Sequence, residues 1–414
     1  MKKFKVGSLF AGVGGICLGF KNAQTENSSY ELAWANEIDE FACTTYRTNF
    51  THELLEGDIK KVLHPEIIDQ EIREAKNVLE DAVDEQDKKE KQNVLAQLLH
   101  DRDEQFNRYS DLHERILREP IDILNGGFPC QAFSIAGEQK GFEDERGNLF
   151  LNIVDLIEQL GEKFYKPRVL FLENVKNLQS HDKGRTYKVI KSKLESCGYT
   201  IYEHVLNTMD YSDLPQNRER IYIVGFLNKD DAEKFNTFSQ EKLISLKKSK
   251  TSKDRENDVK AIIDYNLTKD TAEKYYYTRE KYPHYFVTEE EFETSDKGNR
   301  INLGEQVDEM YQFYQCRRGM YVRKNKSDVC PTLTANMGTG GHNVPLIKVL
   351  DGVRKLTPAE TFKLQGFPVG NGYELPVKHK GKKYSDAQLY KQAGNAVSVP
   401  VITMLATEIL KTIE

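Results

Sequence analysis

Long apolar runs are missing from this chain of 414 residues. No stretch reaches the roughly 18 consecutive apolar residues that a membrane-spanning helix needs. Met-Lys-Lys-Phe-Lys at the start is followed by a strand-like segment and not by the apolar core of a signal peptide. We therefore expect a cytoplasmic protein without a membrane partner.

Cysteine is scarce, and no cysteine forms a C-x-x-C pair or stands at metal-ligand spacing from a histidine. This pattern indicates neither a zinc site nor a disulfide framework, so we expect no metal. Free thiols also suit a reducing compartment. The six cysteines are Cys17, Cys43, Cys130, Cys197, Cys316 and Cys330.

Excess positive charge is missing too, since the formal net charge is −6. The imbalance lies in residues 66–119, where 16 acidic residues face 9 lysines and arginines. This segment has no glycine or proline and repeats apolar residues at helical spacing, as at Ile68, Ile72, Ala75 and Leu79, which predicts a long helix or helical hairpin. Its acidity argues against contact with phosphates. It is either an arm that packs on its own chain or on a partner protein, or a solvated hairpin.

What the chain does contain is a set of short motifs at the ends of apolar strands. Cys130 follows the apolar run 121–124, which we interpret as a buried parallel strand, and lies in the glycine-containing stretch 126–137. Ligands bind at the carboxyl ends of strands in open α/β sheets, so this position suits a nucleophile. Pro129 fixes the backbone angle φ immediately before Cys130 and so makes the chain stiffer there. The glycines that follow allow about twenty residues to move as a lid. The alternative is a buried structural cysteine.

A glycine-rich turn at residues 11–15 links the strand 5–10 to a helix. Its glycine spacing fits neither the dinucleotide fingerprint nor the phosphate-binding loop, which argues against hydride and phosphoryl transfer. A second strand ends at Glu37 and a third at Gly57-Asp58-Ile59. Acids at these strand ends are placed to accept hydrogen bonds from ribose hydroxyls and an adenine amine, which predicts an adenosine-bearing cofactor.

Three later motifs complete the set. They are Glu173-Asn174-Val175 at the end of an apolar strand, Gln216-Asn217-Arg218-Glu219-Arg220 before the strand 221–225, and Gln392-Ala393-Gly394-Asn395-Ala396-Val397. With the glycine-rich turn and Pro129-Cys130-Gln131 in front of them, their order resembles that of the cytosine-C5 DNA methyltransferases. The resemblance covers residues 4–60, 121–228 and 350–410. The family's usual Gly-Asn-Ser-Val reads Gly-Asn-Ala-Val here, which loses one hydroxyl.

The resemblance implies a chemistry for the catalytic residues. C5 of cytosine is too electron-poor to attack a methyl donor, so the thiolate of Cys130 would first add to C6. Glu173 would bond N3 and the 4-amino group, and Arg220, together with Arg218, would bond O2 and steady the developing charge. Taken singly, Glu173 could instead be a strand-end helix cap and the arginines a surface ion pair. The base that removes the C5 proton is not identified and could be a water.

The same resemblance implies the cofactor. It would be S-adenosylmethionine, with S-adenosylhomocysteine as the product, and no metal would take part. The residues expected to contact it are Phe10, Ala11, Gly12, Gly14, Gly15, Glu37, Ile38, Asp58, Ile59, Pro129, Leu149, Asn395 and Ala396.

Recognition of double-stranded DNA is expected in residues 228–348. From Tyr311 to Lys348 the charge turns basic and aromatic residues interleave with the cations, which suits phosphates and bases; the alternative is a half-buried β face edged by lysines. Because C6 is shielded in a stacked base pair, the target cytosine must be flipped out to meet Cys130. The residues expected on the DNA are Gln131, Ser134, Ile135, Lys140, Arg146, Gln216, Arg317, Arg318, Arg323, Thr332 and Leu333.

The expected fold class is α/β: a doubly wound, mostly parallel, Rossmann-like sheet with a smaller strand-rich target-recognition domain and an inserted helical arm. The expected divisions are a catalytic domain at 1–227 with the helical insertion at 66–119, the target-recognition domain at 228–348, a hinge and connection at 349–390, and a C-terminal segment at 391–414. A helix at 399–413 returns to the catalytic domain. Residues 229–260, which are rich in charged residues, are expected to form a hydrated connection or a mobile loop.

By resemblance, the setting is a bacterial restriction–modification system, or a solitary or phage enzyme, acting as a monomer on DNA in the nucleoid-associated cytoplasm. A cognate restriction endonuclease would be encoded nearby but not bound. Two other functions stay open. An RNA cytosine-C5 methyltransferase is disfavoured by the long recognition region, and a catalytically silent nucleic-acid-binding protein is disfavoured by the intact Cys130, Glu173, Arg218 and Arg220.

Overall fold

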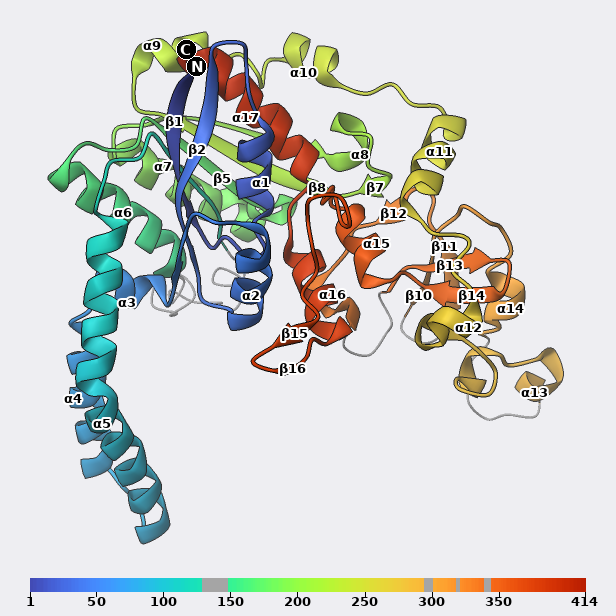
Figure 1. Cartoon of the computed structure of the whole chain (residues 1–414), viewed down its shortest axis with the longest axis horizontal. Coiled ribbons are helices and arrows are strands. Elements are labelled where there is room, and N and C mark those ends of the chain that lie inside the picture. Colours follow the sequence, from blue (N-terminus) through green and yellow to red (C-terminus); the bar gives the residue numbers. More distant parts are fainter. Residues whose placement is uncertain (129–147, 294–300, 318–320, 339–343) are drawn as a thin grey trace.

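The large domain is built on a sheet of mostly parallel strands (Figure 1). The computed structural model describes residues 1–128, 148–293, 301–317, 321–338 and 344–414. The 7-stranded sheet has the order β3-β2-β1-β4-β5-β8-β6, and β8 runs antiparallel to both of its neighbours. The strands are β1 (Lys2–Leu9), β2 (Ser28–Glu37), β3 (Glu53–Glu56), β4 (Ile123–Gly127), β5 (Val169–Val175), β6 (Thr200–Asn207) and β8 (Glu219–Phe226). The expected parallel-dominated α/β fold is confirmed.

Successive residues of the central strands serve opposite faces of this sheet. Ile123 and Val169 pack with Ile402 of α17 (Val399–Ile413), which lies beside α1 (Gly15–Asn22). Leu124 and Leu170 pack on the other face, which is covered by α6 (Asn148–Lys163) and α7 (Arg185–Ser196). Because side chains alternate along a strand, a sheet with helices on both faces requires the near-continuous apolar runs of the sequence.

The closing helix α17 begins and ends at the expected residues. The segment Asp386–Ile413 is long and apolar enough to cross a membrane by length and composition, although it contains no unbroken apolar run of the required length. In the structure, 72% of its apolar 18-residue window is buried. Most of this window is therefore part of the protein core.

The acidic segment forms a helical hairpin that projects from the large domain (Figure 1). It follows the short helix α3 (Ile59–Leu63) and consists of α4 (Ile67–Glu80) and α5 (Glu85–Ile116). Arg102 donates two hydrogen bonds of 2.8 Å to the carboxylate of Asp69, which ties the two helices together. The expected helical hairpin is confirmed, and we call it the arm.

A smaller domain contains a 5-stranded sheet in the order β11-β10-β13-β14-β9. Its strands are β9 (Tyr276–Tyr277), β10 (Tyr314–Arg317), β11 (Tyr321–Lys324), β13 (Leu346–Val349) and β14 (Gly352–Lys355). Its helices are α11 (Ser252–Ile262), α12 (Lys269–Ala272), α13 (Glu289–Glu293) and α14 (Leu303–Gln306). The expectation of a strand-rich domain is wrong, because more of its described residues lie in helices than in strands.

Residues 229–260 are helical and do not form a hydrated loop. Before α11 they contain α9 (Lys229–Lys234) and α10 (Gln240–Leu246). Phe235 and Leu243 enter the core cluster that holds Phe226 and Leu405, so a few well-spaced apolar residues suffice to anchor these short helices. Hence α9 and α10 pack with the large domain, beyond the expected border at residue 228. The small sheet in turn continues past residue 348 through β14.

The two domains are joined by short elements. A parallel ladder pairs β7 (Gln216–Asn217), which follows α8 (Thr208–Tyr211), with β12 (Cys330–Pro331). The chain returns through α15 (Pro358–Lys363), the hairpin of β15 (Lys378–His379) and β16 (Lys382–Lys383), and α16 (Asp386–Asn395). Arg354 and Glu360 form a buried pair with contacts of 2.7 and 2.8 Å at the start of this return.

Candidate active site

A cavity of about 970 Å³ opens at the carboxyl ends of β1, β2, β4 and β5. The glycine-rich turn, the ends of β2 and β5, the start of α6 and the segment after α16 form its wall. Motifs that lie far apart in the sequence therefore meet in one place. The expected residues that line it are Phe10, Ala11, Gly12, Gly15, Glu37, Ile38, Asp58, Ile59, Leu149, Glu173, Arg218, Arg220, Asn395 and Ala396.

The glycine-rich turn uses backbone angles that favour glycine. Gly12 and Gly14 have φ of 55° and 85°, and Phe10 takes φ of 54°, which is uncommon for a residue with a side chain. A Cβ on Gly14 would lie 2.2 Å from the ring of Phe50. Gly14, which was expected at the cofactor, therefore serves the packing of the turn and is not part of the cavity wall.

Glu37 ends β2, and three backbone amides hold its carboxylate. Oε2 accepts from Gly12 N at 2.7 Å, and Oε1 accepts from Ile38 N at 2.9 Å and from Asp39 N at 2.8 Å. Burial raises the pKa of Glu37, and these three hydrogen bonds oppose the rise. Since a carboxylate offers about four acceptor positions, Oε2 can accept one more hydrogen bond from a ligand.

Asp58 caps the short helix α3. One carboxylate oxygen accepts from Lys60 N at 2.9 Å, and in the part of the chain that the structure describes the other oxygen has no hydrogen bond. The strand β3 ends at Glu56, so Asp58 lies beyond the strand and not within it as expected. The acid still lines the cavity and keeps acceptor capacity toward it.

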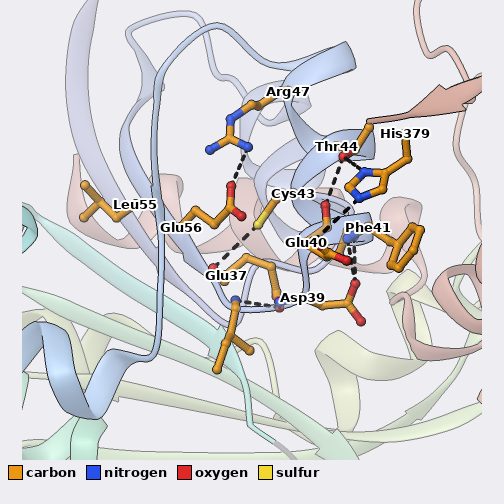
Figure 2. Close-up of polar contacts among 12 residues, drawn as sticks. Glu37, Asp39, Glu40, Phe41, Cys43, Thr44, Arg47, Leu55, Glu56 and His379 are labelled. Atoms are coloured by element: carbon orange, nitrogen blue, oxygen red, sulfur yellow. Dashed lines mark hydrogen bonds and ion pairs between the residues drawn. The ribbon is translucent and has the colours of Figure 1, made fainter. Parts of the chain in front are cut away.

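Two charged residues of the wall that the sequence did not predict pair with each other. Lys391 Nζ donates to Asp39 Oδ2 at 2.7 Å, and Asp39 caps α2 (Glu40–Asn49). Although burial raises the pKa of Asp39, Lys391 and the helix amides hold it below its usual value. Nearby, His379 of the β15–β16 hairpin contacts Thr44 of α2 at 2.7 Å (Figure 2). Such pairing between distant segments leaves no signal in the sequence.

Glu173 and Arg220 meet at the floor of the cavity. They lie on the antiparallel neighbours β5 and β8, with 3.1 Å between Arg220 Nε and Glu173 Oε1. The side chains of Arg220 and Glu173 are only 13% and 10% exposed, respectively, so they form neither a helix cap nor a surface ion pair. Burial raises the pKa of Glu173, while the charges of Arg220 and Arg218 lower it to a smaller extent. Oε1 receives no hydrogen bond of good geometry from the described residues.

Arg218 lies next to this pair but is engaged elsewhere. Its guanidinium donates to the carbonyl oxygens of Leu333 at 3.0 Å, Gly394 at 3.2 Å and Ala396 at 2.5 Å. Burial and the charge of Arg220 lower its pKa to about 9. The two arginines, which were expected to act together, therefore differ: Arg220 faces Glu173, and Arg218 binds the backbone of the cavity wall. A Cβ on Gly394 would lie 2.2 Å from the carbonyl carbon of Thr334, so this junction admits no side chain there.

Two buried polar atoms of the cavity wall have no hydrogen-bond partner in the part of the chain that the structure describes. Asn152 Nδ2 on α6 is buried and has no hydrogen-bond partner among the described residues, as is the case for Glu173 Oε1. Together with Glu37 and Asp58, these atoms offer donors and acceptors to a polar ligand. The volume lies within the roughly 300–1,000 Å³ typical of small-molecule sites. Among the described residues, no group of three His, Cys, Asp or Glu side chains could hold a metal ion.

Several expected residues lie outside the described part of the chain. They are Pro129, Cys130, Gln131, Ser134, Ile135, Lys140, Arg146 and Arg318. The preceding residue, Phe128, is buried, and its carbonyl accepts from Asn174 Nδ2 at 2.8 Å. Phe128 follows the last residue of β4, Gly127, which pairs with Glu173 of β5.

Two residues expected on the DNA are buried in the protein. Gln216 donates to the carbonyl of Leu364 at 2.8 Å, and Leu333 is a core residue that is 1% exposed, so neither is available to DNA. Thr332 bonds the carbonyl of Asn217 at 2.7 Å and lines a second cavity of about 570 Å³, next to Arg220. Arg323 is exposed on β11, and Arg317 ends β10 opposite Tyr321.

Comparison with known families and sequences gives a consistent result. The family model described as "C-5 cytosine-specific DNA methylase" matches residues 4–73 and 74–411. The chain is 40% identical over 409 residues to the Type II methyltransferase M.Bsp6I of Bacillus sp. (strain RFL6), and the match covers 99% of each. It is 31% identical to the Type II methyltransferase M.HhaI of Haemophilus parahaemolyticus, covering 97% of this chain and 92% of that protein.

Solved structures share the fold at lower identity. The Dnmt2 methyltransferase of S. pombe superimposes with a TM-score of 0.55 at 16% identity, covering 100% of both chains. A Dnmt2 mutant of Spodoptera frugiperda gives a TM-score of 0.57 at 17% identity, covering 98% of this chain and 99% of that one. At this identity the likeness concerns the fold.

Proposed function

Because this chain belongs to the C-5 cytosine-specific DNA methylase family, it is a DNA cytosine-5 methyltransferase, and we propose that it uses S-adenosylmethionine to methylate cytosine within a specific sequence of double-stranded DNA. The relatives are named Type II methyltransferases, which supports a bacterial restriction–modification setting. A cytoplasmic location and action as a monomer on DNA follow from the same proposal.

The cavity wall supports the choice of cofactor. Glu37 would accept hydrogen bonds from the ribose hydroxyls through its free Oε2 position, and Asp58 would accept from the adenine amine. Asn152 would donate its unpartnered N–H to a polar group of the ligand. When bound, S-adenosylmethionine would supply an electrophilic methyl group on its sulfonium.

The pair of Glu173 and Arg220 is the observation that carries the catalytic proposal. Because burial favours the protonated carboxyl, Glu173 would donate to N3 of the flipped cytosine and accept from its 4-amino group. Arg220 would bond O2. Cys130 comes three residues after the end of β4 in the sequence, and the last residue of β4, Gly127, pairs with Glu173. Its sulfur would add to C6 and so make C5 nucleophilic. After methylation, loss of the C5 proton would expel the thiolate and restore the ring.

An assay with alternative nucleic acids tests this function. Purified full-length protein is incubated with tritiated S-adenosylmethionine and either duplex DNA or tRNA, and bisulfite sequencing locates methylated cytosines in DNA from a methylation-free host that expresses the gene. We expect tritium in DNA, at cytosines of one recurring sequence. Transfer to tRNA alone would identify an RNA methyltransferase, and transfer to neither would indicate a silent binding protein.

The acids of the cofactor site give a quantitative prediction. Glu37→Ala and Asp58→Ala should each weaken binding of S-adenosylhomocysteine by about 1–3 kcal/mol, the usual cost of stranding a buried hydrogen-bond partner. Calorimetry measures the affinity, and Glu195→Ala on the exposed surface of α7 serves as the matched control. If both variants bind S-adenosylhomocysteine with unchanged affinity, the cofactor binds at a site other than this cavity.

Sequence recognition is assigned to the small domain. We take residues 248–355 as the target-recognition region, because α9 and α10 pack on the large domain. Exposed Arg323 and the Thr332 cavity beside Arg220 support contact with DNA from this side. Exchanging these residues for the matching region of a relative that reads another site should transfer the target sequence, as measured by bisulfite sequencing. A folded, active hybrid that keeps the original target would count against the assignment.

A further inference from the structure

The root of the arm packs against the turn that carries Asp58. Tyr109 and Leu112 of α5 are buried, and a Cβ on Gly57 would lie 3.0 Å from the ring of Tyr109 and 3.2 Å from Leu112 Cδ1. The backbone N–H of Asp58 donates to the Tyr109 hydroxyl at 3.4 Å. The arm therefore contacts both residues of the turn at the edge of the cavity.

Further bonds from the same helix hold the segment on either side of this turn. Before the turn, Arg108 donates to the carbonyl of Glu56 at 2.8 Å, and Arg115 donates to the carboxylate of Glu53 at 2.5 Å. After the turn, His113 Nδ1 lies 3.0 Å from the carbonyl oxygen of Val62. Side chains on one face of α5 thus contact residues along the whole segment 53–62.

The first turns of α4 extend the wall of the cavity. Ile67 and Glu71 line it together with Lys60 and Lys61, and Lys61 pairs with Glu71 at 2.8 Å. The arm is therefore continuous with the candidate cofactor site at its root, whereas its outer half contacts only itself in the described structure. Exposed Val83 and Val94 mark that outer half.

We propose that the root of the arm sets the affinity for the cofactor by positioning Gly57 and Asp58, with Tyr109 and Leu112 as positioning residues. This inference rests on the proposed role of Asp58 as the acceptor for the adenine amine. Without the packing of Tyr109 and Leu112, the short turn between β3 and α3 would be free to shift. Such a shift would weaken the hydrogen bond between Asp58 and the cofactor, because a hydrogen bond weakens steeply as its geometry departs from linear. The outer arm has no part in this role.

Binding of S-adenosylhomocysteine to full-length variants, measured by calorimetry, tests the inference. Tyr109→Phe should raise Kd about threefold, and Leu112→Ala about tenfold, since the first removes one weak hydrogen bond and the second removes packing beneath Gly57. Leu95→Ala is the matched control. Leu95 lies on the same helix, about 25 Å from Leu112 along the helix axis, so this change should leave Kd unchanged. Replacing residues 77–94 with a short Gly-Ser link, which keeps the Asp69–Arg102 pair, should also leave Kd unchanged.

A double-variant cycle separates positioning from mere stabilisation. If Tyr109 acts through Asp58, Tyr109→Phe should have less than a twofold effect on Kd in an Asp58→Ala background. Equal effects in both backgrounds, or an unchanged Kd in Tyr109→Phe and Leu112→Ala proteins that still melt cooperatively, would overturn the inference. Failure of the wild-type protein to bind S-adenosylhomocysteine would instead contradict the proposed function.

Discussion

Replacing Cys130 with serine is expected to abolish methyl transfer and to leave DNA binding intact. An alcohol is a far poorer nucleophile than a thiolate at neutral pH, so addition to C6 should fail. The loss should be on the order of 10⁴-fold or more, as is found when the nucleophile of an enzyme is removed. Incorporation of tritium into duplex DNA measures the rate, and fluorescence anisotropy measures the affinity.

A mechanism-based trap provides the second readout for Cys130. In DNA that contains 5-fluorocytosine, fluorine replaces the C5 proton, so the final elimination cannot occur and the enzyme should stay covalently bound. Wild-type protein should form this adduct on a denaturing gel, and the Cys130→Ser protein should not. A denaturation-resistant adduct of the serine variant would contradict the assignment of the nucleophile.

Replacing Arg218, which precedes β8, should mainly reduce stability, whereas replacing Arg220, which lies on β8, should mainly reduce the rate of methyl transfer. Arg218→Ala leaves three buried carbonyls without a donor and should lower the free energy of unfolding by about 3–9 kcal/mol, at about 1–3 kcal/mol for each stranded group. Arg220→Ala removes the donor that faces Glu173 and should cost about 10²- to 10³-fold in rate, the size expected when a group that stabilises developing charge is lost. Its effect on stability should be much smaller.

Chemical denaturation and single-turnover kinetics on the same two proteins distinguish these outcomes. Each variant serves as the control for the other, since the two variants delete guanidinium groups only two residues apart, one buried and one largely buried. A stable Arg218→Ala protein with a slow chemical step would show that Arg218 acts on the substrate. An Arg220→Ala protein with unchanged kinetics would remove that residue from the catalytic proposal.

The sequence predicted the large domain well because its signals are local. Apolar runs with acids at their ends mark parallel strands, and the residues at those ends converge at one sheet edge whatever the loop lengths between them. Glu37, Asp58 and Glu173 were found in this way and line one cavity. The closing helix at 399–413 was also recognisable, since a long apolar stretch with few charges has few alternatives to the core.

The remaining differences arise where long-range packing decides the outcome. Gln216 and Leu333 stand within family motifs, yet the pairing of β7 with β12 buries both. Arg218 and Arg220 look alike in sequence, and only the position of three distant carbonyls separates them. The region 229–260 is polar enough to suggest a loop, but Phe235 and Leu243 anchor its first helices to a core that composition does not reveal.

The position of α17 affects how the protein is made in the cell. This helix covers one face of β1 and β4, yet the ribosome synthesises it only after the small domain. At about 5–20 residues per second, the interval between β1 and α17 is on the order of 20–80 s, during which that face of the sheet lacks its native cover. A nascent chain therefore cannot complete its large domain before its small domain has been translated, so no fragment with a complete large domain and no small domain is produced along the way.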